Sequence, residues 1–363
     1  MTKHLYAVIM AGGGGTRLWP FSRQKTPKQL IPIFSQRSLF QIAVDRLKGF
    51  IPYERIFVVT VADQVNELQQ QESQLLPGNF LIEPQPRGTA AVVAMAASAI
   101  RKVDPLAVLA VLTADHIISN VTGFQEYLNA AYVVAEKGFI GTLGIHPTYP
   151  ATGYGYIESG ELLGDFSGIQ AFEVKRFIEK PDETRANALF SKKNFTWNSG
   201  MFICQADVML GQYQEHMPEL SAIIKTLEPM LGEDHSGIDF IERWSQIKPQ
   251  TIDYGIMEKT TLAAVLPASD LGWNDVGSWD SFFDLADPDV NGNIVIGARY
   301  TGIDTNNSLI VSNVPDRLIV TLGMKDVIII QTPDALLICP RGESQRVKEL
   351  VNYLKANNLT LFI

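Results

Sequence analysis

A buried strand that runs directly into a cluster of glycines is the feature that most constrains this chain. Leu5–Met10 is a continuous apolar run, typical of a strand covered on both faces of a sheet. Four glycines, Gly12–Gly15, follow almost at once. Without Cβ atoms, such a loop can turn tightly and bring its backbone N–H groups against a ligand. Because parallel sheets bind ligands at the carboxyl ends of their strands, the loop predicts a binding site at that edge.

The first half of the chain alternates strand-like and helix-like segments. The expected strands span residues 5–10, 55–60 and 107–113, and the expected helices span residues 38–48, 63–76 and 89–102. Ser38 can cap the first of these helices. After Gly153, the alternation of apolar and polar residues in 154–158 and 172–179 predicts antiparallel strands. The pattern predicts an α/β fold with a Rossmann-like, mostly parallel mixed sheet that is covered on both faces.

The sequence also predicts a second, smaller domain. Residues 288–293 read Pro-Asp-Val-Asn-Gly-Asn, a turn-rich break typical of a boundary. We therefore expect one domain over residues 1–287 and another over residues 288–363. Short apolar segments separated by Gly, Asn, Asp and Pro predict that the second domain is a small β-structure, closed by a helix over residues 344–357.

Composition narrows the class of protein. The chain has 363 residues, of which 46% are hydrophobic and 19% charged, so it can bury a large core. Its net charge of −9 argues against nucleic acid or an anionic membrane as the main partner. Cys204 and Cys339 both end apolar runs, so we expect neither a disulfide framework nor a zinc site. No segment has the pattern of a secretory signal or a membrane span, which predicts a cytoplasmic protein.

Two cations follow the glycine loop. No Gly-Lys-Ser/Thr sequence follows the glycines, and their spacing does not match Gly-x-Gly-x-x-Gly, so the loop is neither common nucleotide motif. Arg17 and Lys28 instead predict a clamp for phosphate groups. The alternative is a glycine-rich turn with solvated surface cations.

Two carboxylates are candidates for a metal site. Asp115 ends the apolar segment 107–113, which predicts that it shares a sheet edge with the glycine loop. Asp275 lies between Trp273 and Trp279. Two carboxylates together with substrate phosphates can hold Mg²⁺, which prefers oxygen ligands and keeps some of its water. The alternatives are a helix cap for Asp115 and a turn carboxylate for Asp275.

Several short motifs, which follow one another along the chain, resemble the signature of the sugar-nucleotide pyrophosphorylases. These enzymes are nucleoside-triphosphate sugar-1-phosphate nucleotidyltransferases. The resemblance begins with Ala11-Gly12-Gly13-x-Gly15-Thr16-Arg17-Leu18-x-Pro20. The fuller string, with Trp19-Pro20-Phe21-Ser22-Arg23 and Pro27-Lys28-Gln29, is similar to the mannose-1-phosphate guanylyltransferase branch. Further motifs of that branch follow in family order: Glu83-Pro84-x-x-Arg87-Gly88-Thr89-Ala90, Ala114-Asp115-His116, Gly153-Tyr154-Gly155-Tyr156-Ile157, Phe177-Ile178-Glu179-Lys180-Pro181, Trp197-Asn198-Ser199-Gly200-Met201-Phe202 and Trp273-Asn274-Asp275-Val276-Gly277-Ser278-Trp279.

The resemblance implies transfer of GMP from GTP to α-D-mannose 1-phosphate, giving GDP-mannose and pyrophosphate. It also implies a GT-A-like catalytic domain, a C-terminal domain similar to a short left-handed β-helix that supports homodimers, and a bound Mg²⁺ or similar divalent cation. Two alternatives stay open: a related enzyme with another nucleotide and sugar, and a non-catalytic regulatory paralogue that binds sugar nucleotides. Some family members carry a fused phosphomannose isomerase domain; because this chain ends at Ile363, we expect a single activity.

By the same resemblance, the site residues form three groups. The catalytic group is Arg17, Lys28, Asp115, Lys180 and Asp275, with Asp115 and Asp275 converging on the metal. The nucleotide-binding group is Ala11, Gly12, Gly13, Gly15, Thr16, Glu83, Pro86, Gly88 and Thr89. The sugar-binding group is Gly153, Glu179 and Asn198.

Physical arguments bear on two of these groups. Guanine presents two adjacent donors, and a carboxylate accepts two parallel hydrogen bonds, so Glu83 can select guanine over pyrimidines. The alternative is a solvated loop acid. Glu179 and Lys180 offer an acceptor and a cation for a sugar phosphate. Because neighbouring strand residues point to opposite faces, they can reach one ligand only if the strand ends or bulges there.

Overall fold

The computed structural model describes residues 2–13, 15–33, 36–231 and 237–363. The chain forms two compact units, each built from segments that alternate along the sequence. The first unit contains Met1–Gly12, Asp45–Thr113 and Ile118–Trp273, and the second contains Gly13–Val44, Ala114–Ile117 and Asn274–Ile363. The division of the chain into one domain over residues 1–287 and another over residues 288–363 remains a prediction.

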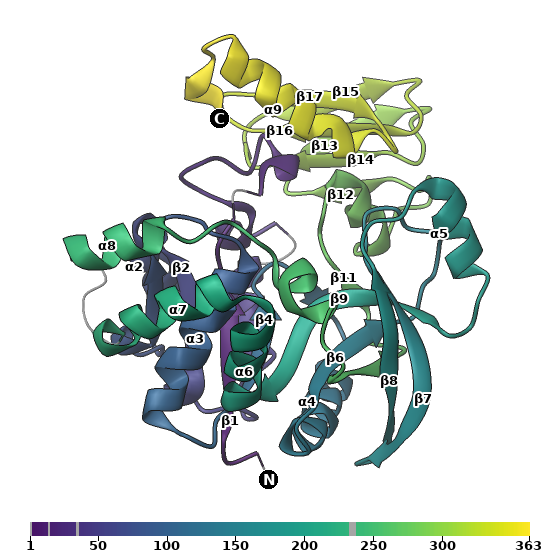
Figure 1. Cartoon of the computed structure of the whole chain (residues 1–363). Helices are drawn as coiled ribbons and strands as arrows, with labels where there is room; N and C mark the ends of the chain where they lie inside the picture. Colours follow the sequence, from purple (N-terminus) through teal and green to yellow (C-terminus); the bar gives the residue numbers. More distant parts are fainter. Residues whose placement is uncertain (1, 14, 34–35, 232–236) are drawn as a thin grey trace. The chain divides into compact units, whose positions relative to one another are not determined.

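A nine-stranded mixed sheet forms the centre of the described part of the first unit (Figure 1). Its strands are β1 (Leu5–Met10), β2 (Ile56–Val61), β3 (Phe80–Glu83), β4 (Val108–Thr113), β6 (Ile140–Ile145), β7 (Tyr156–Phe166), β8 (Ile169–Ile178), β9 (Phe195–Gln205) and β10 (Ala263–Ala268). They lie in the order β3-β2-β1-β4-β9-β6-β10-β8-β7. The strands β3, β2, β1 and β4 are parallel, as the repeated strand–helix order predicts.

The remaining strands are mostly antiparallel. The strand β9 pairs antiparallel with both β4 and β6, and β7 pairs antiparallel with β8. Because β7 also pairs with β9, the strands β9, β6, β10, β8 and β7 close into a ring. Tyr156 of β7 lies opposite Trp197 of β9, so the ends of these two strands are held side by side.

The described part of the first unit also contains α-helices. They are α2 (Ala62–Gln71), α3 (Thr89–Val103), α4 (Val121–Glu136), α5 (Glu183–Phe190), α6 (Ala206–His216), α7 (Pro218–Leu227) and α8 (Ile238–Ser245). All residues from Ala90 to Ile100 of α3 are buried, because this helix contacts β1, β2 and β3 as well as α6 and α7. Its small alanine side chains allow that close packing on every side. None of the helices in the described ranges is long and apolar enough to span a membrane.

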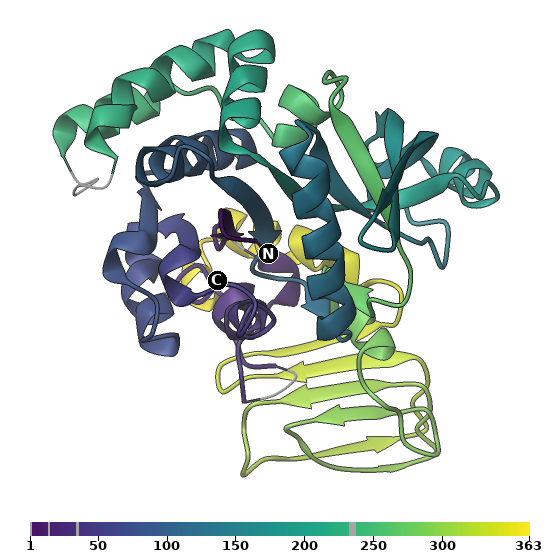
Figure 2. The ribbon, with the colours of Figure 1, turned by 90° about the horizontal axis from the view of Figure 1, so that it is seen from below.

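The second unit contains stacked parallel strands near the C-terminus. In one sheet, β12 (Ile294–Ile296), β14 (Leu309–Ser312) and β16 (Val327–Gln331) are parallel, and β17 (Leu336–Pro340) is antiparallel to β16. In a second sheet, β13 (Arg299–Ile303) is parallel to β15 (Leu318–Leu322). Figure 2 shows these strands, green to yellow, in successive layers. Parallel pairing of successive strands in two sheets is the arrangement of a β-helix.

An N-terminal segment shares the hydrophobic core of these strands. Leu18 and Trp19 belong to the same core cluster as Trp279, Leu309 and Ile328. The Trp279 indole Nε1 donates a hydrogen bond to the Trp19 carbonyl oxygen at 2.9 Å. Residues that follow the glycine loop are therefore anchored on the C-terminal part of the chain.

Two helices complete the second unit. The helix α1 (Leu39–Asp45) begins after Ser38, whose hydroxyl accepts from the Gln41 backbone N–H at 3.1 Å. The Gln41 side-chain oxygen accepts from the Ser38 N–H at 3.0 Å, which completes a capping box. The helix α9 (Val347–Ala356) follows a 3₁₀ turn (Ser344–Arg346) in the segment where the sequence predicts the closing helix. The short strands β5 (Ile117–Ile118) and β11 (Trp273–Asn274) lie where the chain passes between the units.

Candidate functional site

The predicted site residues divide between the two units. Those of the second unit are Gly13, Gly15, Thr16, Arg17, Lys28, Asp115 and Asp275. Those of the first unit are Ala11, Gly12, Glu83, Pro86, Gly88, Thr89, Gly153, Glu179, Lys180 and Asn198.

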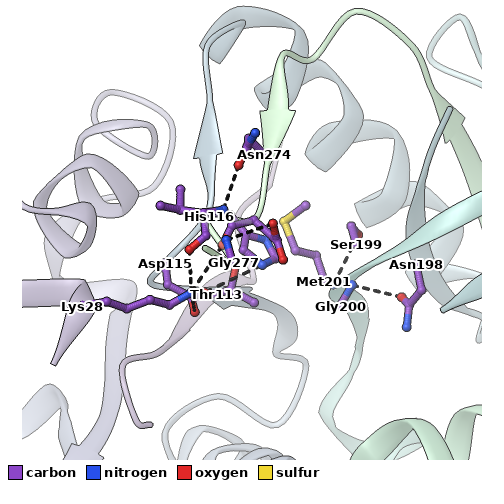
Figure 3. A network of polar contacts seen from close by, with 12 residues as sticks. Lys28, Thr113, Asp115, His116, Asn198, Ser199, Gly200, Met201, Asn274 and Gly277 are labelled. Carbon is purple, nitrogen blue, oxygen red and sulfur yellow. Dashed lines mark hydrogen bonds and ion pairs between the residues drawn. The ribbon is translucent and has the colours of Figure 1, made fainter. Parts of the chain in front are cut away.

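Lys28 is the meeting point of three distant segments in the second unit. It begins a short 3₁₀ helix (Lys28–Leu30), and its Nζ lies 2.8 Å from Asp115 Oδ2 (Figure 3). The same Nζ donates to the backbone carbonyl oxygens of Asp275 at 3.3 Å and Val276 at 3.4 Å. The structure thus brings both predicted metal-binding positions to one ammonium group, and we call Lys28, Asp115, Asp275 and Val276 the Lys28 cluster.

A strained turn directs the carbonyl groups of this cluster toward the lysine. Val276 is fully buried and has φ of 46°, a left-handed conformation that is rare for a β-branched residue. Its N–H donates to the Asn274 side chain at 2.8 Å, and the Gly277 N–H donates to Asp275 Oδ1 at 3.1 Å. These hydrogen bonds and the core around Val276 stabilise the turn.

The glycine loop approaches Lys28 closely. Gly15 has φ of 48°, and a Cβ atom placed there would lie 2.7 Å from Lys28 Cγ, so only glycine leaves the lysine in place. Gly13 also has a positive φ, and Gly14 lies outside the described residues. Thr16 and Arg17 belong to a 3₁₀ helix (Thr16–Leu18), where the Arg17 side chain is exposed. No described residue forms an ion pair or hydrogen bond with the Arg17 guanidinium.

Charge in the Lys28 cluster favours an ionised Asp115. Burial raises the pKa of Asp115, but the Lys28 ammonium and His116 outweigh it and hold that pKa below its usual value. His116 Nε2 lies 3.7 Å from Asp115 Oδ1. Sequence reasoning gave His116 no role of its own, although it stands beside Asp115 in the family motif.

The donors of this cluster fit a hard divalent cation. Asp115 presents its carboxylate to Lys28, whereas Asp275 contacts Lys28 through its backbone carbonyl and its carboxylate accepts from the Gly277 N–H. Carboxylate oxygen is the ligand type that Mg²⁺ prefers. Within the described residues there is no group of three or more His, Cys, Asp or Glu side chains placed to hold a metal. Two carboxylates suit Mg²⁺, since it usually takes its other ligands from water and substrate phosphates.

Glu83 ends β3 in the first unit and is 4% exposed. Its Oε2 is buried without a hydrogen-bond partner among the described residues, while its Oε1 would lie 3.1 Å from a Cβ on Gly12. Ala11, the residue before Gly12, is buried, and its N–H donates to the Val59 carbonyl oxygen within β2 at 2.9 Å. Burial raises the pKa of Glu83 to about 7, partly offset by the Arg87 backbone N–H. An unpaired buried acceptor is a candidate ligand contact.

The loop after Glu83 is tied to a distant segment. Gly88 precedes α3, and Pro86 lies exposed in the loop. The Ala90 N–H donates to the Gln250 carbonyl oxygen at 3.2 Å. The Thr89 hydroxyl accepts from the Ile252 N–H at 3.0 Å. The loop that carries the predicted nucleotide contacts is therefore fixed against residues 250–252.

The predicted sugar-binding residues lie together in the first unit. β8 ends at Ile178, and Lys180 has φ of 41°. The chain therefore leaves the extended conformation at Glu179 and Lys180, which allows these neighbouring side chains to reach the same ligand. Lys180 Nζ lies 2.7 Å from Glu179 Oε1. A Cβ on Gly155 would lie 2.5 Å from Glu179 Oε2, and the Asn198 N–H donates to the Gly155 carbonyl oxygen at 2.8 Å.

Aromatic rings surround the turn before β7. Tyr154 contacts Trp197 and Trp273 edge-on, with ring centroids 5.0 and 5.3 Å apart, and Tyr149 also packs on Trp197. Gly153, in this turn, is exposed with open space where a side chain would project. The rings hold the turn while leaving the backbone at Gly153 accessible.

Sequence reasoning missed one acid in this region. Asn198 Nδ2 donates to Asp253 Oδ1 at 2.8 Å. Asp253 begins a π-helix (Asp253–Met257), and no motif considered in the sequence contains it. The irregular helix type is the signal that could have indicated it, but only a structure reveals it.

Comparisons with known proteins identify the family of the chain. Residues 6–291 match the family model described as nucleotidyl transferase, and residues 298–354 match the MannoseP isomerase/GMP-like beta-helix domain. The chain is 35% identical over 366 residues to a mannose-1-phosphate guanylyltransferase of Escherichia coli, covering 98% of this chain and 75% of that protein. It is 37% identical over 365 residues to a mannose-1-phosphate guanylyltransferase of Salmonella typhimurium, covering 97% and 72%.

A solved structure gives the same result for the fold. The protein named mannose-1-phosphate geranyltransferase from Thermus thermophilus superposes with a TM-score of 0.87 at 29% identity, covering 97% of this chain and 99% of that one. The predicted α/β fold with a mostly parallel mixed sheet and a C-terminal β-helix-like domain is confirmed. The chain belongs to the nucleotidyl transferase family and, within it, to the mannose-1-phosphate guanylyltransferases.

Proposed function

We propose that this protein transfers GMP from GTP to α-D-mannose 1-phosphate, forming GDP-mannose and releasing pyrophosphate. The observation that carries the chemistry is the meeting of Asp115 and the Asp275 backbone at the Lys28 ammonium. Sequence relatives with this activity in their names supply the substrate class.

In this reaction a phosphate oxygen of the sugar phosphate attacks the α-phosphorus of GTP. The new P–O bond forms as the bond between the α-phosphorus and the bridging oxygen breaks, and pyrophosphate leaves with the electron pair. The nucleophile is already anionic at neutral pH, so no general base is required. Catalysis therefore depends on positioning two polyanions and stabilising the developing negative charge.

The triphosphate is proposed to contact residues of the second unit and the residues that directly precede Gly13 in the chain. Lys28 and Arg17 provide cations, and the backbone N–H groups of the glycine loop provide further donors. Asp115 and Asp275 would hold Mg²⁺ or a similar divalent cation. Such a cation supplies positive charge to the phosphate oxygens.

The sugar phosphate is proposed to bind the residues grouped around Glu179. Lys180 would contact the phosphate, while Glu179 and Asn198 would bind sugar hydroxyls. The open space at Gly153 would allow the sugar to approach the backbone. An acceptor and a cation 2.7 Å apart match the two kinds of group that a sugar phosphate presents.

Guanine is proposed to be selected by Glu83. Its buried Oε2 lacks a partner among the described residues, which supports a ligand contact there. The nucleotide would also contact the backbone of Ala11 and Gly12 and the loop that includes Pro86, Gly88 and Thr89. Uracil and thymine offer one donor flanked by acceptors, which an ionised carboxylate repels.

A homodimer is proposed to form through the C-terminal β-structure. Leu318, Val320 and Leu322 of β15 are 51%, 63% and 71% exposed, as is Ile303 of β13 at 65%. A row of exposed apolar side chains on a flat sheet is typical of a face that another chain covers. Light scattering should give the mass of two chains, and Val320→Lys should give the mass of one.

The proposed activity is tested with a matrix of substrates. Purified protein and Mg²⁺ are mixed with GTP, UTP or dTTP and with mannose 1-phosphate or glucose 1-phosphate, and pyrophosphate release is measured. The highest kcat/KM is expected for GTP with mannose 1-phosphate. A higher kcat/KM for another pair would overturn the substrate assignment, and absence of turnover with intact nucleotide binding would favour a regulatory protein.

A further inference from the structure

Asp253 is an acid to which neither the family motifs nor the proposed reaction assigns a role. It opens the π-helix Asp253–Met257, a rare local structure that is frequent at functional sites. The backbone just before Asp253 is held by a hydrogen bond, because Ile252 donates its N–H to the Thr89 hydroxyl at 3.0 Å. Gln250 is bonded through its backbone to Arg87 and Ala90. Asp253 therefore stands on a segment that is held at several points.

The contact between Asp253 and Asn198 fixes the orientation of an amide. Asn198 Oδ1 accepts from the Gly200 N–H at 3.0 Å, and Asn198 Nδ2 donates to Asp253 Oδ1 at 2.8 Å (Figure 3 shows the Asn198–Gly200 bond). A backbone N–H can only donate and an ionised carboxylate can only accept, so the amide cannot be turned over. The second N–H of Asn198 then has a fixed direction in which it can donate to a ligand oxygen.

The surroundings of Asp253 are unfavourable for a purely structural carboxylate. Burial and the nearby charge of Glu179 raise the pKa of Asp253, against the Asn198 bond and the Lys180 ammonium, which lower it. Glu258 is part of the same group, because burial and then the charges of Glu179 and Asp253 raise its pKa, while Lys259 lowers it. Three carboxylates, those of Glu179, Asp253 and Glu258, and two cations, Lys180 and Lys259, therefore influence one another, and a ligand with hydroxyl donors would satisfy carboxylate oxygens in this group.

We propose that Asp253 is a positioning residue for the sugar 1-phosphate, holding the Asn198 amide so that it donates to a sugar hydroxyl oxygen. This inference rests on the proposed function. It assigns the sugar contact to the Asp253 side chain alone. Residues 250–252 hold the nucleotide-binding loop through their own backbone groups, which a change of the Asp253 side chain leaves in place. Loss of Asp253 should then weaken recognition of the sugar and leave recognition of GTP unchanged.

The test is a double-mutant cycle in the full chain. Asp253→Ala should raise the KM for mannose 1-phosphate about tenfold, the effect of losing one hydrogen bond that orients a ligand contact. The KM for GTP should not change. Asp253→Asn should restore most of the affinity, because its side-chain oxygen can still accept from Asn198. In an Asn198→Ala background, Asp253→Ala should have little further effect.

Two results would overturn the proposal. One is an equal rise in both KM values, which a general structural defect would cause. The other is an Asp253→Ala effect of undiminished size in the Asn198→Ala background. Thermal unfolding of each variant checks that it folds; if Asp253→Ala does not, Asp253→Leu, whose side chain has a similar size and no acceptor, replaces it in the cycle.

Failure of the proposed function would look different. If the wild type releases no pyrophosphate from GTP and mannose 1-phosphate, the transferase assignment fails. Calorimetric titration of the same variants with mannose 1-phosphate and with GTP then measures the positioning directly. The expected result is about tenfold weaker binding of mannose 1-phosphate by Asp253→Ala with unchanged GTP binding. Equal binding of mannose 1-phosphate by wild type and variant would contradict it.

Discussion

Among individual residues, Lys28 connects the proposed chemistry to the fold most directly. Its ammonium faces the Asp115 carboxylate and two backbone carbonyl groups, and its side chain is 15% exposed. A cation held in this way is oriented before substrate arrives, which is what charge stabilisation requires. Nearby Lys25 is exposed, so the chain offers its own comparison.

Lys28→Ala should lower kcat by about 10²–10³, because a preoriented cation is lost from the triphosphate. The melting temperature should fall far less than the rate, since the contacts that are lost, one ion pair with a partly exposed Asp115 and two long hydrogen bonds to carbonyl oxygens, contribute modestly to stability. Lys25→Ala is the matched control and should keep wild-type turnover. Initial rates of pyrophosphate release measure both variants; wild-type kcat in Lys28→Ala would refute the role.

Glu83 should make recognition of GTP depend on pH. Its pKa is raised to about 7, so the carboxylate that accepts from guanine becomes protonated as the pH falls through neutrality. The KM for GTP should therefore rise below pH 7, approaching about tenfold for each further pH unit. Glu83→Gln should abolish this dependence and reduce the preference for GTP over UTP. Glu67→Gln, an exposed acid on α2, is the control and should retain both; an unchanged profile in Glu83→Gln would contradict the assignment.

At the scale of elements, the strands expected over residues 5–10, 55–60 and 107–113 lie within one residue of their predicted bounds, whereas β7 extends to Phe166 rather than to residue 158. The helix ends agree less closely. The strand β1 has the bounds that the sequence predicts, and α3 extends one residue beyond its expected end. The helix α2 ends at Gln71 rather than at residue 76. Glu72 already leaves the helical conformation, with φ of −132° and ψ of 74°. Pro77 begins a 3₁₀ turn and holds Leu76 in an extended conformation, which excludes Leu76 from the helix. Apolar periodicity does not record such a turn.

The cap of α1 gives a prediction at this scale. Ser38→Ala removes the hydroxyl that accepts from the Gln41 N–H, so the free energy of unfolding should fall by about 1 kcal/mol. Ser38→Thr keeps a hydroxyl and should lose much less. Urea denaturation compares the two variants, and equal stability of Ser38→Ala and wild type would exclude the cap as a source of stability.

For the molecule as a whole, the second unit links the glycine loop to the C-terminal strands. Leu18 and Trp19 share a core cluster with residues from β14 and β16, although hundreds of residues separate them in the sequence. The stability of the Lys28 segment should therefore depend on the packing of the β-helix-like strands. This explains why a β-structure remote in sequence belongs to the same compact unit as the phosphate-clamp residues.

Leu309→Ala tests this link. Leu309 is fully buried in that core, so the free energy of unfolding of the second unit should fall by about 2–5 kcal/mol. Heat inactivation of the transferase should shift to lower temperature together with the part of the tryptophan fluorescence change that comes from Trp19 and Trp279. This part is isolated by repeating the measurement with Trp197, Trp244 and Trp273 of the first unit replaced by Phe. Val290→Ala, at a fully exposed position, should shift neither. Activity that survives after the second unit has unfolded would contradict the link.

The sequence by itself determined the local features: the apolar strand before the glycines, the alternation of strands and helices, and Asp115 just after the end of β4. These follow from residue periodicity and glycine content, which act over a few positions. The matching ends of β1 and β4, with Met10 opposite Thr113, also agree with the expected parallel edge. The resemblance to the family motifs then predicted which residues form the site.

Only the tertiary structure decided how distant segments combine. The left-handed turn at Val276, the two carbonyl groups that meet Lys28, and the bond between Asp253 and Asn198 join residues that no local pattern relates. Such contacts depend on packing across long chain separations, where the surrounding core can impose a strained turn or keep three acids together. The periodicity of the sequence does not show where core packing outweighs backbone strain or charge repulsion. The sequence could therefore identify the acids and cations of the site but not the residues that each of them contacts.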